Sequence, residues 1–156
     1  VQTAFGGGDR DAVVVKINAE FTALVYSTYL GGATSAFAIG LALDSSGYVY
    51  VTGYTNSAGF PSKTPIQPAP PGGLTEKTVF IAKLNPAGTA LVYSTFLGGS
   101  LLDLGPDFAA SIGWGIAVDS AGQAPVASVV QPTPVLGGKA GNMPFSPRAP
   151  LCMRSR

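Results

Sequence analysis

Four residues in the second half of the sequence have side chains that suit carbohydrate recognition. Asp103 and Asp107 lie in the segment 100–113, with Phe108 and Trp114 close by. Aromatic rings stack on sugar rings, carboxylates accept hydrogen bonds from hydroxyl groups, and paired carboxylates can hydrolyse a glycosidic bond. We predict these four as candidate ligand-binding residues and predict no catalytic residue. The more common interpretation of such a cluster is two solvated loop acids beside a Trp that fills a core.

Other common catalytic and metal sites are excluded by residue type. The chain has no His and one Cys, Cys152, so zinc sites with His ligands, Ser-His-Asp triads and Cys-His pairs cannot form within one chain. The two Asp-Ser-x-Gly segments, at 44–47 and 119–122, have turn chemistry rather than the several oxygen ligands that calcium needs. We therefore expect a non-enzymatic protein with no metal and no cofactor.

Composition favours an all-β protein without electrostatic partners. Of 156 residues, 46% are apolar and 11% charged, and 21 Gly and 13 Pro separate short β-branched and aromatic runs. The net charge of +1 offers no basic stripe, so no nucleic-acid partner is predicted.

Residues 22–43 carry no charge and are long enough for a membrane span. The matching run after Thr89 is interrupted by Asp103, and both runs contain Gly-Gly and Ser/Thr at strand-like spacing, so no span is predicted.

The sequence contains an internal repeat. Aligning residues 13–32 with 80–99 gives twelve identities in twenty positions, including the whole of Thr-Ala-Leu-Val-Tyr-Ser-Thr at 22–28 and 89–95. Residues 40–47 match 115–122 at a slightly larger offset. Self-similarity of this kind indicates a repeat architecture. The strands expected from alternation and turn residues are Val13–Ile17, Leu24–Leu30, Ile39–Leu43, Tyr48–Tyr54, Val79–Leu84, Leu91–Leu97 and Ile116–Val118. The segment 55–78, rich in Pro and Gly, is expected to be a long loop with a short extended piece at 60–66. Long loops on a β scaffold are common binding sites, but a spacer is the more common interpretation for a segment with so few charged residues.

These motifs resemble a known repeat. The order Gly-Leu-Ala-Leu-Asp-Ser-Ser-Gly, Tyr-Val-Thr-Gly, Phe-Ile-Ala-Lys-Leu-Asn-Pro-Ala-Gly and Ala-Leu-Val-Tyr-Ser-Thr-Phe-Leu-Gly-Gly is similar to the bacterial β-propeller repeat known as SBBP, over residues 11–128. The resemblance implies four-stranded antiparallel blades in secreted or cell-surface proteins. It brings no catalytic residues.

The phase of the repeat predicts one complete blade, from residue 39 to 97, flanked by two half-blades. Residues 12–30 supply the outer strands of a preceding blade, and residues 112–130 supply the inner strands of a following one. Two blade-equivalents cannot close a ring, so the expected partners are further blades of a longer chain or copies of the chain itself. A compact two-sheet β structure is the third possibility.

The C-terminal end departs from the repeat. Pro125 removes a ladder donor and is expected to weaken the strand at 123–128. We predict a partial propeller at 1–128 and a divergent Pro-rich tail at 129–156, from a joined or frame-shifted sequence or from a natural terminal segment. The function expected is a non-catalytic extracellular structural or interaction module; the alternative is a carbohydrate-binding, lectin-like module, and third a glycan-cleaving enzyme.

Overall fold

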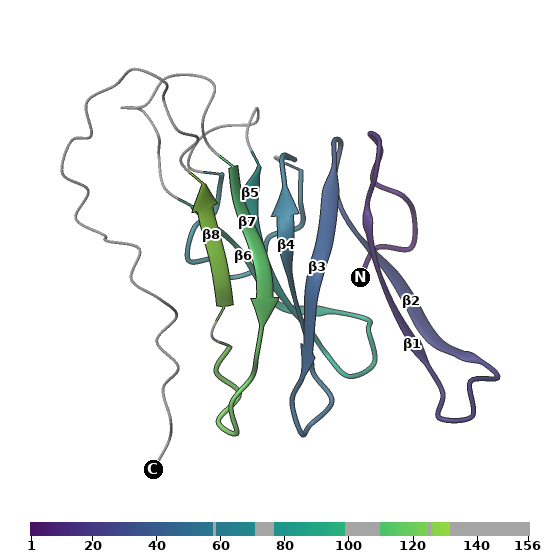
Figure 1. Ribbon diagram of the computed structural model, residues 1–156. Helices are drawn as coiled ribbons and strands as arrows, with labels where there is room; N and C mark the ends of the chain where they lie inside the picture. The colour runs from purple at the N-terminus through teal and green to yellow at the C-terminus, as the bar shows by residue number, and fades with distance from the viewer. Residues whose placement is uncertain (58, 71–76, 99–109, 125, 132–156) are drawn as a thin grey trace, which may run out of the picture.

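The computed structural model describes residues 1–57, 59–70, 77–98, 110–124 and 126–131, which form eight β-strands and no helix (Figure 1). They make three separate antiparallel sheets. β1 (Ala12–Ile17) and β2 (Leu24–Leu30) form the N-terminal hairpin, and β7 (Ala110–Ile116) and β8 (Val126–Gln131) form the C-terminal hairpin. Between them lies the central sheet, with the strand order β3 (Ala36–Leu43), β4 (Val49–Thr55), β5 (Thr78–Leu84) and β6 (Leu91–Leu97).

This arrangement confirms the all-β fold and the predicted phase of the repeat. One complete four-stranded sheet stands between two half-sheets, and in the described residues the sheets do not close into a ring. The N-terminal hairpin and β8 lie at opposite sides of the molecule (Figure 1). The uncharged run 22–43 forms β2 and β3, and within the described ranges there is no helix long and apolar enough to cross a membrane.

The first strand of each repeat contains a bulge that the sequence did not reveal. In β3 the pairing with β4 shifts between Ala38 and Gly40 and then continues to Ala36, so this strand begins three residues earlier than Ile39. In β7 the same shift occurs between Gly113 and Gly115. The prediction of a strand at Ile116–Val118 was therefore wrong, because the strand ends at Ile116.

The last strand also begins later than the repeat suggests. Gln123 belongs to the preceding turn, since its amide donates to Asp119 Oδ1 at 2.7 Å and its carbonyl accepts the Asp119 amide at 3.0 Å. β8 consequently starts at Val126 and crosses the boundary predicted between residues 128 and 129. Pro125 and residues 132–156 lie outside the described residues, as do the predictions made for them.

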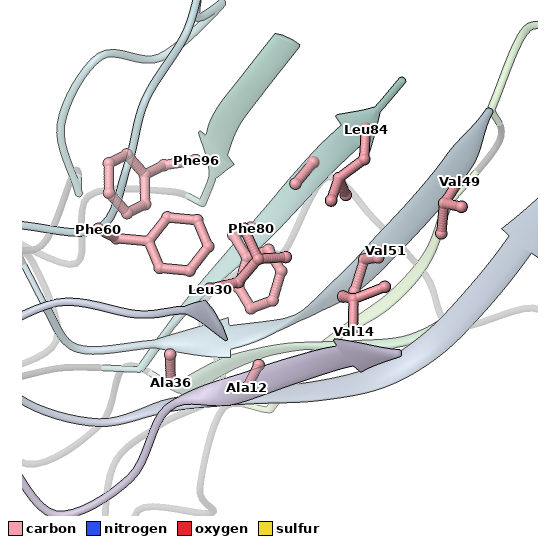
Figure 2. Close-up of a cluster of buried hydrophobic side chains, with 11 residues drawn as sticks. Ala12, Val14, Leu30, Ala36, Val49, Val51, Phe60, Phe80, Leu84 and Phe96 are labelled. Carbon is pink, nitrogen blue, oxygen red and sulfur yellow. The ribbon is translucent and has the colours of Figure 1, made fainter. Parts of the chain in front are cut away.

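The N-terminal hairpin packs on one face of the central sheet. Successive side chains of a strand point to opposite faces, so Phe80, Ala82 and Leu84 share one face of β5, here called the Phe80 face. Ala12 and Val14 of the hairpin, here called the Val14 face, join these residues in a single buried cluster (Figure 2). The cluster consists of Ala12, Val14, Leu30, Ala36, Val49, Val51, Phe60, Phe80, Ala82, Leu84 and Phe96.

The C-terminal hairpin packs on the opposite face, which carries Lys83 and is called the Lys83 face. Glycines allow β7 to come close to the central sheet: a Cβ at Gly113 would overlap the hydroxyl of Thr52, and one at Gly40 would lie 3.2 Å from the Cα of Gly115. Each face of the central sheet is therefore covered in part by a neighbouring hairpin, as is typical of a sheet whose strands have apolar residues on both faces.

The segment between β4 and β5 has a structural role rather than that of a spacer. Phe60 is buried, with its ring centroid 4.4 Å from that of Phe80 and 6.1 Å from that of Phe96. Lys63 forms an antiparallel bridge with Ser94 on the outer edge of β6. This part of the chain thus covers an otherwise open strand edge.

Candidate functional site

The structure describes one of the four predicted ligand-binding residues. Trp114 lies in β7 at the bulge, and its side chain is 58% exposed. Ile39 occupies the corresponding bulge position of β3 and is also exposed. Asp103, Asp107 and Phe108 lie outside the described residues, so the predicted cluster is represented by its exposed indole alone.

The two turn aspartates act as turn residues. Asp44 Oδ1 accepts the amides of Ser46 at 3.0 Å and Tyr48 at 2.9 Å, and Asp119 Oδ1 accepts the equivalent amides of Ala121 and Gln123. Among the described residues, no three His, Cys, Asp or Glu side chains gather as a metal site would require. Both carboxylates are thus committed to backbone amides.

A charged and aromatic cluster that the sequence did not reveal lies on the Lys83 face. Lys83 Nζ lies 3.7 Å from Asp44 Oδ2, 4.4 Å from the ring centroid of Tyr48 and 4.6 Å from that of Tyr50. The register of the sheet explains the grouping, because Tyr50, Lys83 and Tyr93 are directly opposite one another on β4, β5 and β6. With this register, strand alternation is enough to place the three side chains on one face; without it, the sequence could not group them.

Electrostatics make this cluster a structural ion pair. Burial lowers the pKa of Lys83, but the Tyr50 hydroxyl and the charge of Asp44 outweigh it and raise that pKa above its usual value. Burial acts against ionisation of Asp44 as well, yet hydrogen bonds from Tyr48, Tyr50 and Ser46 and the charge of Lys83 lower its pKa. Both groups are charged at neutral pH, and a lysine whose pKa is raised is a poor general base.

The same cluster joins the central sheet to the C-terminal hairpin. The hydroxyl of Tyr50 lies 3.1 Å from Asp44 Oδ2 and 3.0 Å from the carbonyl oxygen of Gly122, two acceptors within reach of its single proton. Tyr50 itself is fully buried. The arrangement fixes one sheet against the next.

The most unusual surface is the outward face of the N-terminal hairpin. Val13, Val15 and Ile17, here called the Val15 face, are between 45% and 48% exposed. Their equivalents in the next repeat are Phe80, Ala82 and Leu84, each with 0% exposure. Positions that form the core in the complete sheet are therefore open to solvent in the hairpin.

A second open surface lies on the Lys83 face near β6. It is a hollow of about 330 Å³ lined by Thr64, Ile66, Ile81, Tyr93, Thr95 and Ala124. Ile66, at its rim, is 83% exposed. The C-terminal hairpin covers β3 to β5 from this side, and the hollow lies beyond it, toward the outer edge of the sheet. The lining of the hollow contains apolar side chains and no carboxylate, which makes the hollow suitable for contact with another apolar face.

Comparison with known proteins supports the repeat. Residues 25–61 match the family model of the β-propeller repeat SBBP. No curated protein matches the chain. The matched segment includes nearly all of β2, all of β3 and β4, and the start of the segment that closes the sheet edge. The chain thus contains a β-propeller repeat, and the matched unit runs from the outer strand of one sheet into the inner strands of the next.

Proposed function

We propose that this chain is a non-catalytic structural or interaction module of a secreted or cell-surface bacterial protein, and that it acts through the open faces of its propeller-type sheets. The observation that carries the proposal is the contrast between equivalent positions. Val13, Val15 and Ile17 are exposed where Phe80, Ala82 and Leu84 are fully buried. Covering one half-exposed Val or Ile contributes about 1 kcal/mol to the free energy of association. A partner that covers all three side chains is therefore bound more tightly by about 3 kcal/mol.

The chemistry of the described residues supports a non-catalytic role. Asp44 and Lys83 neutralise each other, Asp119 holds a turn, and Asp11 accepts the amide of Gly6 at 2.6 Å. None of these groups has a partner arranged to activate it as a nucleophile or base. The extracellular location rests on the resemblance to the SBBP repeat, and immunoblots of culture supernatant, surface-proteolysed cells and lysate test it.

Association of the purified chain tests the interaction role. We expect sedimentation velocity to show concentration-dependent association that Val15→Lys abolishes. The matched control is Ala87→Lys, which adds the same charge at an exposed turn of the central sheet. A wild-type chain that stays monomeric at high concentration, or equal association of both variants, would contradict the proposed function.

Carbohydrate binding is a second candidate because Trp114 presents an exposed indole. Exposed aromatic rings provide stacking surfaces for sugars. A glycan array with the wild-type chain and Trp114→Ala tests this function; binding must be present and must be lost in the variant. Hydrolysis of the bound glycans, assayed on the same samples, tests the third possibility of glycan cleavage.

A further inference from the structure

We propose that copies of this chain assemble head to tail, with the Val15 face of one copy covering the hollow on the Lys83 face of the next. This inference rests on the proposed function and names its partner. The N-terminal hairpin packs on the Phe80 face of the central sheet and the hollow lies on the opposite, Lys83 face, so each copy can use one surface toward each neighbour. Such a contact is heterologous, and it can close into a ring.

The chain already contains one example of this interface. The Val14 face of the N-terminal hairpin lies on the Phe80 face of the central sheet, where Val14 is buried and Val1 and Tyr26 pack against the core cluster. The repeat gives Val14 and Tyr26 counterparts at the hollow, Ile81 and Tyr93. Ile66 is the counterpart of Val1, because the next residues, Gln67 and Gln2, make matching hydrogen bonds to Gly98 and Gly31. The hollow is therefore lined by residues equivalent to those of the Val14 face. Within the chain, the Val14 face packs on the Phe80 face of the central sheet.

The surface that covers the hollow should be an exposed face equivalent to the Phe80 face of the central sheet. In the described part of the chain the counterparts of Phe80, Ala82 and Leu84 are Val13, Val15 and Ile17, which make up the Val15 face. A second copy can thus supply the face that the hollow lacks. Its apolar side chains fit a hollow lined mainly by apolar and hydroxyl-bearing residues.

Strand pairing gives the contact a register. β7 and β8 correspond to β3 and β4, and β1 and β2 correspond to β5 and β6, so β8 of one copy and β1 of the next can pair as β4 and β5 do. The pair Gly53↔Phe80 in the central sheet then predicts Ser128 opposite Val13 of the next copy. Two half-sheets become one four-stranded sheet, and the edges of β8 and β1, which pair with no other strand among the described residues, become paired.

Phe21 is an independent indication that the hairpin has a partner. It is 84% exposed, and its φ of 57° lies in the left-handed region, which is costly for an aromatic residue. Its counterpart is Gly88, with φ of 68°, against which the Tyr26 ring lies so closely that a Cβ would overlap it. In the head-to-tail contact Tyr93 takes the place of Tyr26 and Phe21 of the next copy takes that of Gly88, so the Tyr93 ring must lie farther from the turn than the Tyr26 ring does, where it packs on the Phe21 ring instead of on a glycine. The strained position gains a contact that the isolated hairpin does not provide.

The contact also accounts for a third exposed group. Leu41 and Leu43 lie on the Phe80 face of β3, beyond the N-terminal hairpin, and both are exposed. In the assembled four-stranded sheet, the C-terminal hairpin of the neighbouring copy lies beside the N-terminal hairpin and covers this part of the face. The described residues of each copy supply eight strands, as many as two four-stranded blades, so copies of this part of the chain would form rings of roughly four to eight blades from two to four copies.

Two one-sided variants test the arrangement. The double variant Val13→Asp/Val15→Asp disables the hairpin surface, and the double variant Thr64→Asp/Ile66→Asp disables the rim of the hollow. All four side chains are exposed, so we expect both variants to fold. We expect each variant alone to sediment as a monomer and their equimolar mixture to form a dimer and nothing larger, because one intact surface of each kind remains. Far-ultraviolet circular dichroism checks that both variants are folded.

The outcomes separate this inference from the proposed function. If the hollow variant alone still dimerises, the Val15 faces meet each other and the head-to-tail arrangement is overturned, while the interaction role stands. If the wild-type chain associates but the mixture stays monomeric, the arrangement is overturned as well. A monomeric wild-type chain overturns both.

A disulfide tests the register. In a Cys152→Ser background, mixing Ser128→Cys with Val13→Cys should give a disulfide-linked dimer under oxidising conditions, since opposite residues of antiparallel strands have Cα atoms at about 4.5–5.5 Å. Ser128→Cys mixed with Glu20→Cys, at the exposed hairpin tip, is the matched control. Equal linkage in both mixtures, or none in the first, overturns the register.

Discussion

Gln67 and Gly98 exchange two hydrogen bonds across the outer edge of the central sheet. Gln67 Nε2 donates to the carbonyl of Gly98 at 3.1 Å, and the Gly98 amide donates to Gln67 Oε1 at 3.0 Å. Gln2 and Gly31 form the same pair at 3.2 Å and 2.9 Å on the outer edge of the N-terminal hairpin. A glutamine therefore closes the outermost strand of each repeat.

Removing this glutamine is expected to destabilise the central sheet. Gln67→Ala loses two side-chain hydrogen bonds and leaves the Gly98 amide and carbonyl without these partners, at a cost of about 1–3 kcal/mol. Chemical denaturation followed by circular dichroism measures the free energy of unfolding. Gln123→Ala, which removes an exposed glutamine side chain from a turn, is the control and should change stability little.

The contact between β7 and the central sheet predicts a contrast between two glycines. Gly113→Ala should destabilise by about 2 kcal/mol or more, since its Cβ would overlap Thr52 and come within 3.1 Å of Val79. Gly115→Ala should be neutral or slightly stabilising, because a Cβ there would meet nothing within 4 Å. Equal effects in thermal unfolding would show that β7 does not pack as described.

Tyr50→Phe should cost about 1–2 kcal/mol. The substitution keeps the buried ring and removes only the hydroxyl between Asp44 and the Gly122 carbonyl. Tyr48→Phe is the matched control, because its ring lies beside the same lysine and its hydroxyl makes no hydrogen bond within the described part of the chain. Urea denaturation of both variants decides the comparison, and equal losses would contradict the bridging role.

Stability should fall with acidification through Asp44. Its pKa in the folded chain lies below the usual 3.8, so its contribution is fully present above about pH 5 and is lost as the pH falls through the folded-state value. Asp44→Asn retains an oxygen for the turn amides but has no charge for Lys83. We expect the free energy of unfolding of this variant to depend less on pH in this acidic range, measured by denaturation at a series of pH values. An unchanged pH dependence would rule out the ion pair as its source.

Phe21→Gly should separate stability from association. Glycine adopts the left-handed conformation without strain, so the isolated chain should gain up to about 1 kcal/mol. The same substitution removes the ring offered to Tyr93 of a neighbouring copy and should weaken association. Denaturation of dilute protein and sedimentation of concentrated protein give the two readouts, and a gain in both would argue against the aromatic contact.

The sequence predicted the part of the fold that depends on periodicity. Repetition of residues 13–32 at 80–99 and alternation within each copy were sufficient for the strand order and for the phase of one complete sheet between two halves. Strand bounds at Ala36 and Ala110 were missed, because a bulge breaks the alternation on which such predictions depend. The glutamine pairs were missed because Gln2 and Gln67 are 65 residues apart, whereas their partners Gly31 and Gly98 are 67 apart.

The interaction surfaces could be predicted only in outline. Exposed apolar edges follow from an incomplete set of strands, and the sequence already favoured further blades or copies of the chain as partners. The pairing of the Val15 face with the hollow needed the structure, because it depends on which side of each strand faces the central sheet. The conformation of Phe21 could not be predicted from the sequence, since a Phe in the left-handed region contradicts the turn preference of its residue type.

The matched repeat, residues 25–61, begins in β2 and ends after β4, so its ends do not coincide with the ends of a sheet. Tandem duplication of one full repeat, from residue 13 to residue 79, adds the two outer strands of one blade and the two inner strands of the next in a single genetic event. Each new unit is thereby a continuous segment of chain that contributes strands to two neighbouring blades. Arrays that grow in this way keep every internal blade tied to both neighbours, and mechanical load along the chain passes through sheet packing as well as through the connecting loops.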